Sequence, residues 1–418
     1  MFSKLNSSNI FVLFILNLLN FINYRTFIFA TIISFSFFIY KDVNFSNKEK
    51  VLLKILPLNY FIKNFMSLES NSGIFWDMQN FIHYLKCNIG EISHTYLFTL
   101  TKKECPDTIG YGPLTEYLKI YDLSIWNTVV VFFILFVIIT SVFLFKADDS
   151  LLLAVVILIS PGFHFLIFSL NTDIFVITYV VYLLSRKNLD INIQNLIIIS
   201  LITQVKIYTI FLFFGYFLIY FLKKDKKSLS IISLFTITNL FFLIRHYLID
   251  DFDIPAPISF TRTFGVYHDL QIVRDYIGYD ELSILIFFTF VLLLFGKNKI
   301  QQLSNNFLNN ISKETSLKIL LIFPVNMIIN LYQNWGYKFL FNSIFIYIIF
   351  NYCTKPFKVY LIITTLFSTM YYMIGWGFEA TIINYILISL SKLTFYSFVV
   401  FTIYICLQSI TKITEDQS

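Results

Sequence analysis

The sequence predicts an all-α polytopic integral membrane protein with roughly 11–14 transmembrane helices. Three observations lead to this fold class. The 418 residues are 57% hydrophobic and only 13% charged, whereas soluble domains carry roughly a quarter charged residues. Mean hydropathy is +0.73, and apolar stretches of about membrane-spanning length recur along the chain. We therefore expect residues 1–418 to form a single integral membrane domain with no separate soluble domain.

A transmembrane helix needs about 20 predominantly apolar residues, or fewer where its ends lie in the interface. The stretches that we predict as helices on this criterion are 9–24, 26–40, 127–145, 150–168, 171–185, 192–205, 207–222, 228–248, 283–296, 317–333, 338–352, 357–374 and 381–407. Several are short, and broken or re-entrant helices persist at membrane depth only when buried in protein or facing water. Segment 52–68 is either a further crossing or an interfacial helix broken at Pro57.

Short basic loops alternate with these predicted helices. Counted in order, one side receives the lysines and arginines near positions 146, 186, 223–227, 297–299 and 355–358, and the positive-inside rule makes that side cytoplasmic. The extracytoplasmic side then receives a long first loop, 69–125, and a second loop, 249–282. The net charge of +6 follows from this topology, so no nucleic-acid partner is implied.

The long first loop contains a candidate general base. Asp77 directly follows the apolar run Ile74-Phe75-Trp76, and a partly desolvated carboxylate is more basic and can take a proton from an attacking hydroxyl. The alternative is a helix N-cap, where Asp is also favoured. The same loop holds Cys87 and Cys105, which are free or bridged depending on the compartment.

Further polar residues interrupt the apolar stretches on the same side. Asn171 and Asp173 lie between two apolar runs, so the acid is either solvated at the interface or faces a cavity inside the bundle. Lys206 and Lys338 each lie between two spans and either reach the headgroups or hold a phosphate. Arg262 is one of several cations that run against the positive-inside trend there, which favours an anionic ligand.

Metal and nucleotide motifs are absent from the sequence. The five His residues show neither HExxH nor a Cys/His cluster, and there is no P-loop and no GxGxxG. We therefore expect no metal site and no cofactor, although composition does not fix a metal requirement. Cys353 and Cys406 fall in or beside predicted spans and are interpreted as packing residues.

The order of the motifs resembles the bacterial integral-membrane mannosyltransferases of the glycosyltransferase-C superfamily, which use polyprenyl-phosphate sugars. An acid in the first extracytoplasmic loop, an aromatic residue, a Gly and a Y-x-P-L element are matched by Asp77, Tyr84, Gly90 and Tyr111-Gly112-Pro113-Leu114. An S-P run and a G-N-x-D element are matched by Ser160-Pro161 and Asn171-Thr172-Asp173, with Leu170 in place of the usual Gly.

The resemblance continues to residue 341. A Lys in a short hydrophobic hairpin that ends in a basic cluster is matched by Lys206-Ile207-Tyr208 and Lys223-Lys224. Thr263-Phe264-Gly265 is similar to the family's S-F-G. Residues 334–338 resemble its N-x-x-Y-x-Y-R/K turn, from which Trp335 and Gly336 depart.

The resemblance implies an inverting glycosyltransferase in the bacterial cell (inner) membrane with an extracytoplasmic active site. A hexose, mannose or another, would pass from a polyprenyl-phosphate donor to a glycan or lipid acceptor, with Asp77 as the base. Lys206, Lys338 and Arg262 would bind the lipid phosphate, and the other substrate-binding residues implied are Tyr111, Asn171, Asp173 and Tyr337.

Two other classes of protein remain open. A multispan transporter or flippase would use Asp173 and Lys206 as coupling or substrate residues, although such folds typically contain inverted repeats and no internal repeat is evident. A polysaccharide polymerase or ligase also combines many spans, a large outer loop and cations for lipid phosphate.

The predicted topology is tested by labelling a cysteine at position 77. In a chain whose four native cysteines are replaced by Ser, Asp77→Cys should react with a membrane-impermeant thiol reagent added outside intact cells. A Cys placed at Lys224 is the control and should react only after permeabilisation. Protection of position 77 in intact cells would place the loop on the cytoplasmic side.

Overall fold

The computed structural model describes residues 173–186, 189–246, 263–264, 311–331, 334–335, 340–374 and 382–415. Eight of the predicted spans overlap these residues, and the described part of each contains a helix, so the prediction of a helical chain is confirmed there. The other predicted spans, 9–24, 26–40, 127–145, 150–168 and 283–296, lie outside the described residues, as do loop 69–125 and most of loop 249–282.

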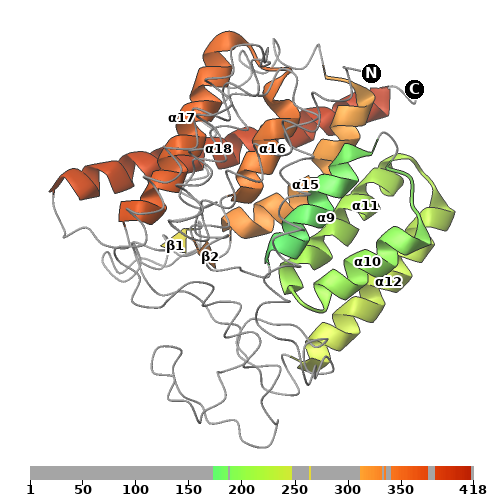
Figure 1. The fold of residues 1–418 in the computed structure, drawn as a ribbon. Helices are drawn as coiled ribbons and strands as arrows, with labels where there is room; N and C mark the ends of the chain where they lie inside the picture. Colours follow the sequence, from blue (N-terminus) through green and yellow to red (C-terminus); the bar gives the residue numbers. More distant parts are fainter. Residues whose placement is uncertain are drawn as a thin grey trace, which may run out of the picture.

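The first group of helices forms a run of antiparallel segments (Figure 1). It consists of α9 (Asp173–Ser185), α10 (Ile193–Thr203), the 3-10 turn η3 (Ile207–Ile210), α11 (Phe211–Leu222) and α12 (Lys226–Ile244). The predicted boundary at Lys206 is confirmed, because α10 ends at Thr203 and a 3-10 turn begins at Ile207.

The second group contains four helices and one short strand. These are α15 (Lys313–Leu331), β2 (Asn334–Trp335), α16 (Leu340–Phe350), α17 (Lys355–Ile374) and α18 (Ile382–Glu415). A second short strand, β1 (Thr263–Phe264), pairs antiparallel with β2, with Thr263 opposite Trp335. Residues 334 and 335, the first two of the 334–338 segment that resembles the family's turn, are extended in this strand pair, and residues 336–338 lie outside the described residues.

Three described helical segments are long and apolar enough to cross a membrane, judged by length and composition. They are Lys226–Ile244, Lys313–Leu331 and residues 394–414 of α18. On α12, the large apolar side chains of Leu234, Ile237 and Phe241 are each more than 60% exposed. Apolar side chains exposed in this way mark a surface that is covered by lipid or by another protein.

The turn from α11 to α12 is specified locally. Lys224 has a positive φ of 55°, and the amides of Lys224 and Asp225 donate to the carbonyl oxygens of Phe221 and Tyr220, which is the Schellman arrangement. Asp225 then caps α12, because both the hydroxyl and the backbone N–H of Ser228 donate to its carboxylate. These two bonds lower the pKa of the Asp225 carboxyl.

Helix α15 is the centre of the described bundle, since it packs against α11, α16 and α18. Its tightest contact is with α11 at Gly215. A Cβ atom added there would lie 2.1 Å from the carbonyl oxygen of Leu321, so only Gly permits this distance between the two backbones. Small residues allow such close approach of membrane helices.

Helix α18 crosses the other three helices of the second group (Figure 1). Phe398 packs edge-on against Phe345 of α16, with ring centroids 6.2 Å apart. Phe401 contacts Phe357 of α17 at 4.4 Å, and Thr402 reaches the sulfur of Met327 in α15. A short stretch of α18 therefore joins three helices.

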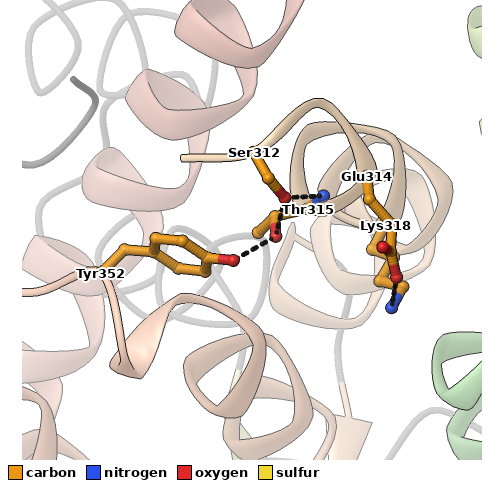
Figure 2. Close-up of polar contacts among 5 residues, drawn as sticks. All are labelled: Ser312, Glu314, Thr315, Lys318 and Tyr352. Carbon is orange, nitrogen blue, oxygen red and sulfur yellow. Dashed lines mark hydrogen bonds and ion pairs between the residues drawn. The ribbon is translucent and has the colours of Figure 1, made fainter. Parts of the chain in front are cut away.

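Polar contacts fix both ends of the α15–α16 pair. At one end Asn330 and Asn342 exchange two amide hydrogen bonds of 2.8 Å, and both side chains are buried. At the other end Ser312 caps α15 by accepting from the amide of Thr315, whose hydroxyl lies 2.7 Å from that of Tyr352 (Figure 2). These contacts show that α15 and α16 run antiparallel.

The same end of α15 carries the exposed pair of Glu314 and Lys318, which are 2.5 Å apart and one helical turn from each other (Figure 2). An exposed pair at this spacing contributes only about 0.3–0.5 kcal/mol. The hydroxyl contact between Thr315 and Tyr352 is part-buried and joins α15 to the chain that follows α16, so it is the more important connection at this end.

We expect Gly215→Ala to destabilise the bundle. The added methyl group meets backbone rather than a flexible side chain, and overpacking a core costs about 1–3 kcal/mol. Thermal unfolding in detergent should show a lower midpoint for Gly215→Ala, whereas Phe214→Leu, at a 43% exposed neighbour, should leave it nearly unchanged. An unaltered midpoint in Gly215→Ala would show that α11 and α15 are not in backbone contact.

Candidate functional site

Asp173, Lys206 and Tyr208 form a polar cluster inside the helical bundle. The Lys206 ammonium lies 3.3 Å from Asp173 Oδ1, and the Tyr208 hydroxyl donates to the same oxygen at 2.8 Å. The Asp173 side chain is 1% exposed and that of Lys206 is 13% exposed. A charged pair in such surroundings is costly to desolvate and is a marker of function in membrane proteins.

Local structure positions each member of this cluster. Asp173 is the first residue of α9, where the helix dipole favours a negative charge. Lys206 has extended backbone angles between α10 and η3, so the chain turns at this residue. The Thr209 hydroxyl lies 2.8 Å from the Lys206 carbonyl oxygen and 3.0 Å from the Thr203 hydroxyl, and these contacts hold the turn.

A chain of amides and hydroxyls joins α10 to α12 beside this turn. Gln204 donates to the Asn239 side-chain oxygen at 2.8 Å, and the Asn239 amide donates to the Ser200 hydroxyl at 2.9 Å. Asn239 is five residues before Ile244, the last residue of α12, which corresponds to about 7.5 Å of helix. The chain next to the Lys206 turn therefore lies level with the interior of α12 and not with its last residue.

The second group of helices meets this cluster at the start of α16. The ring of Phe341 packs edge-on against Tyr208, with centroids 5.7 Å apart. Strands β1 and β2 lie near the same end, because β2 falls between the end of α15 and the start of α16 (Figure 1). Described segments far apart in the sequence, at 173, 206–208, 263–264, 334–335 and 340–341, thus gather at one end of the bundle.

Two of the predicted site residues are described, and the structure brings them together. For Asp173 the solvated alternative is wrong, because the residue is completely buried. The Lys206 side chain forms an ion pair with Asp173. The remaining predicted residues, Asp77, Tyr111, Asn171, Arg262, Tyr337 and Lys338, lie outside the described residues.

Sequence reasoning did not single out three polar residues of this region. Tyr208 was noted only as the aromatic neighbour in the Lys206-Ile207-Tyr208 element, yet it donates directly to Asp173. Gln204 and Asn239 were not identified at all. The available indication was that Asn239 is the one amide side chain in the mainly apolar helix α12, where a buried polar group requires a partner.

Within the described ranges, no three His, Cys, Asp or Glu side chains gather closely enough to hold a metal ion. Cys353 and Cys406 are both buried and free, in agreement with their interpretation as packing residues.

Comparison with protein-family models, curated proteins and solved structures finds no match to this chain. The geometry therefore defines the class of the described part, a helical bundle with membrane-length helices and a buried ion pair, and its function has to be argued from that site.

The energetic role of the ion pair is tested by a double-mutant cycle. Lys206→Met leaves the carboxylate of Asp173 without its cation, and removing one partner of a buried pair costs about 3–5 kcal/mol. Asp173→Asn should cost less, because the Lys206 side chain is the more exposed of the two. The double variant removes both charges and should recover much of the loss in thermal stability.

A matched control is available in the pair of Lys223 and Asp190, which are 3.8 Å apart with the Asp190 side chain 72% exposed. Lys223→Met should lower stability by at most about 1 kcal/mol. If the loss of stability in the double variant equalled the sum of the losses in the two single variants, the two buried residues would not be energetically coupled.

Proposed function

We propose that this chain is a multispan membrane glycosyltransferase that moves a hexose from a polyprenyl-phosphate donor to an extracytoplasmic glycan or lipid acceptor. The proposal includes a glycosyltransferase-C-like architecture of roughly 11–14 spans and a location in the bacterial cell membrane. It rests on the ordered motifs of the sequence and on the arrangement of the segments that carry them.

The observation that carries the proposal is the gathering of four motif segments at one end of the bundle. Asp173 belongs to the N-x-D element and Lys206 to the hairpin element, and their side chains are in contact. β1 contains the first two residues of the T-F-G element and β2 the first two of the 334–338 element, and these strands pair. Elements of a single site are expected to converge in this way.

The chemistry follows from the charges that these segments contribute. The acceptor hydroxyl loses its proton to Asp77 as its oxygen forms a bond to the anomeric carbon. The bond from that carbon to the lipid phosphate breaks, and the phosphate departs with the electron pair. One displacement inverts the anomeric centre, in contrast to the two carboxylates and covalent intermediate of a retaining mechanism.

Cations stabilise the phosphate as it leaves, and preorganised charges are most effective away from water. Lys206 is such a cation, because its side chain is only 13% exposed and its turn is held by hydrogen bonds. In sequence, Arg262 directly precedes β1, and Tyr337 and Lys338 closely follow β2. The polyprenyl chain remains in lipid, so a nucleotide-binding motif is not required.

A transporter is the second candidate, because a buried acid and lysine also occur in ion and substrate pathways. The two functions differ in the fate of the donor. A transferase consumes polyprenyl-phosphate hexose and releases polyprenyl phosphate, whereas a transporter or flippase moves its substrate across the membrane unchanged.

The test is a transfer assay with the purified full chain, polyprenyl-phosphate hexoses and candidate acceptors. Loss of a general base lowers the rate by about 10²–10⁴-fold, so Asp77→Asn should abolish most product formation. Lys206→Gln should lower kcat by about 10²-fold or more, as expected for a lost electrostatic stabiliser. Lys223→Gln, at the opposite end of α11, should retain wild-type activity.

Folding of each variant is checked by its thermal unfolding curve. Retained transfer in a folded Asp77→Asn variant would remove Asp77 from the role of base. Failure of the wild-type protein to consume any polyprenyl-phosphate hexose, together with movement of a solute into vesicles, would favour the transporter.

A further inference from the structure

The ion pair between Asp173 and Lys206 is asymmetric. The carboxylate is 1% exposed and the lysine side chain 13% exposed, so a molecule that approaches the pair from outside meets the ammonium group first. The lysine has already lost most of its hydration in the folded protein. An incoming anion therefore does not have to desolvate it, and such preorganisation favours binding.

Asp173 is held independently of Lys206. The Tyr208 hydroxyl donates to Asp173 Oδ1 at 2.8 Å, which is closer than the 3.3 Å contact with the ammonium group. Tyr208 is itself fixed by its packing against Phe341. The carboxylate therefore keeps a strong hydrogen-bond donor if the ammonium group turns to another anion.

The surface that follows this turn is apolar. On α11 the rings of Phe214, Phe217 and Phe221 are each more than 40% exposed and recur at helical spacing, with Phe217 and Phe221 stacked at 6.3 Å. A ligand that combines an anionic headgroup with a long hydrocarbon chain matches a largely buried cation whose turn leads directly into a helix with an exposed apolar face.

We infer that Asp173 is the resident counter-ion of Lys206 and that the phosphate of an isoprenoid phosphate displaces it from the ammonium group. This inference takes the ligand class from the proposed function, on which it rests, and assigns a role to Asp173. The acid competes with the lipid phosphate for one cation, so the charge of Lys206 is balanced by Asp173 in the unliganded protein. Release of the phosphate is assisted because the carboxylate reclaims the lysine.

Equilibrium binding to the purified full chain in detergent tests this exchange. The probes are farnesyl phosphate, farnesol and inorganic phosphate, and the variants are Asp173→Asn, Lys206→Gln and the double variant. Without its competitor, Lys206 should bind farnesyl phosphate about tenfold more tightly in Asp173→Asn than in wild type, which corresponds to about 1.4 kcal/mol. The gain should disappear in the double variant, and farnesol should not show it.

Each other outcome overturns the inference. Equal or weaker binding of farnesyl phosphate by Asp173→Asn would show that the acid does not compete with the ligand. A tightening that persists in the double variant would show that Lys206 is not the cation involved. Binding of inorganic phosphate as tight as that of farnesyl phosphate would identify free phosphate as the ligand.

A second measurement applies if Asp173→Asn does not fold. Farnesyl phosphate should raise the thermal midpoint of the wild type through ligand linkage, and this shift should be lost in the neutral double variant. A shift that is equal in both proteins would overturn the inference.

These assays contain no sugar, so they separate the inference from the proposed function. Tighter binding by Asp173→Asn without hexose transfer by the wild type would refute the transferase alone. Hexose transfer by the wild type without tighter binding would refute the counter-ion exchange alone.

Discussion

The arrangement of the described helices depends on the backbone contact between α11 and α15. Because Gly215 has no Cβ, the carbonyl oxygen of Leu321 can lie where a methyl group would otherwise be. This contact joins the first group of helices, which positions Asp173 and Lys206, to the second group, in which α16 carries Phe341 and Asn342. The packing of Tyr208 against Phe341, and with it the position of the acid that Tyr208 holds, depends on two helix groups kept at this distance.

Polar groups in an apolar bundle need partners from within the protein, and the partners found here come from different helices. Gln204 and Asn239 join α10 to α12, Asn330 and Asn342 join α15 to α16, and Asp173 and Tyr208 join α9 to η3. Interhelical hydrogen bonds in membranes contribute about 0.6 kcal/mol each on average. Their main effect is directional, since each bond fixes how far two helices are shifted along one another.

The sequence predicted where helices occur better than where they end. Each of the eight predicted spans that overlap the described residues contains a helix, and three helical segments there are long and apolar enough to cross a membrane. Hydropathy placed the last helix at 381–407, whereas α18 continues to Glu415. The added residues are mostly polar but compatible with helix, and Lys412 in the last turn suits the helix dipole. Similarly, α15 begins at Lys313 because Ser312 caps it, and hydropathy does not detect a cap.

Contacts between residues that are far apart in the sequence were harder to predict. Asp173 and Lys206 were both candidates for a binding site, but a linear pattern gave no reason to pair them. The pairing arises because α10 is short and returns the chain to the start of α9. The strand pair of β1 and β2 has only two residues on each side, which is too few to produce an alternating pattern. Asn239 was overlooked because one amide hardly changes the hydropathy of an apolar helix.

The length of α10 has a consequence for the surrounding lipid. Its 11 residues extend only about 16 Å, about half of the 30 Å hydrocarbon thickness, yet Ile193, Ile197 and Leu201 on its surface are exposed. A bilayer that meets so short an apolar face compensates by local thinning, at a modest cost for each ångström of mismatch. Headgroups would then descend toward the Lys206 turn, and an amphiphile could reach that depth without leaving its leaflet.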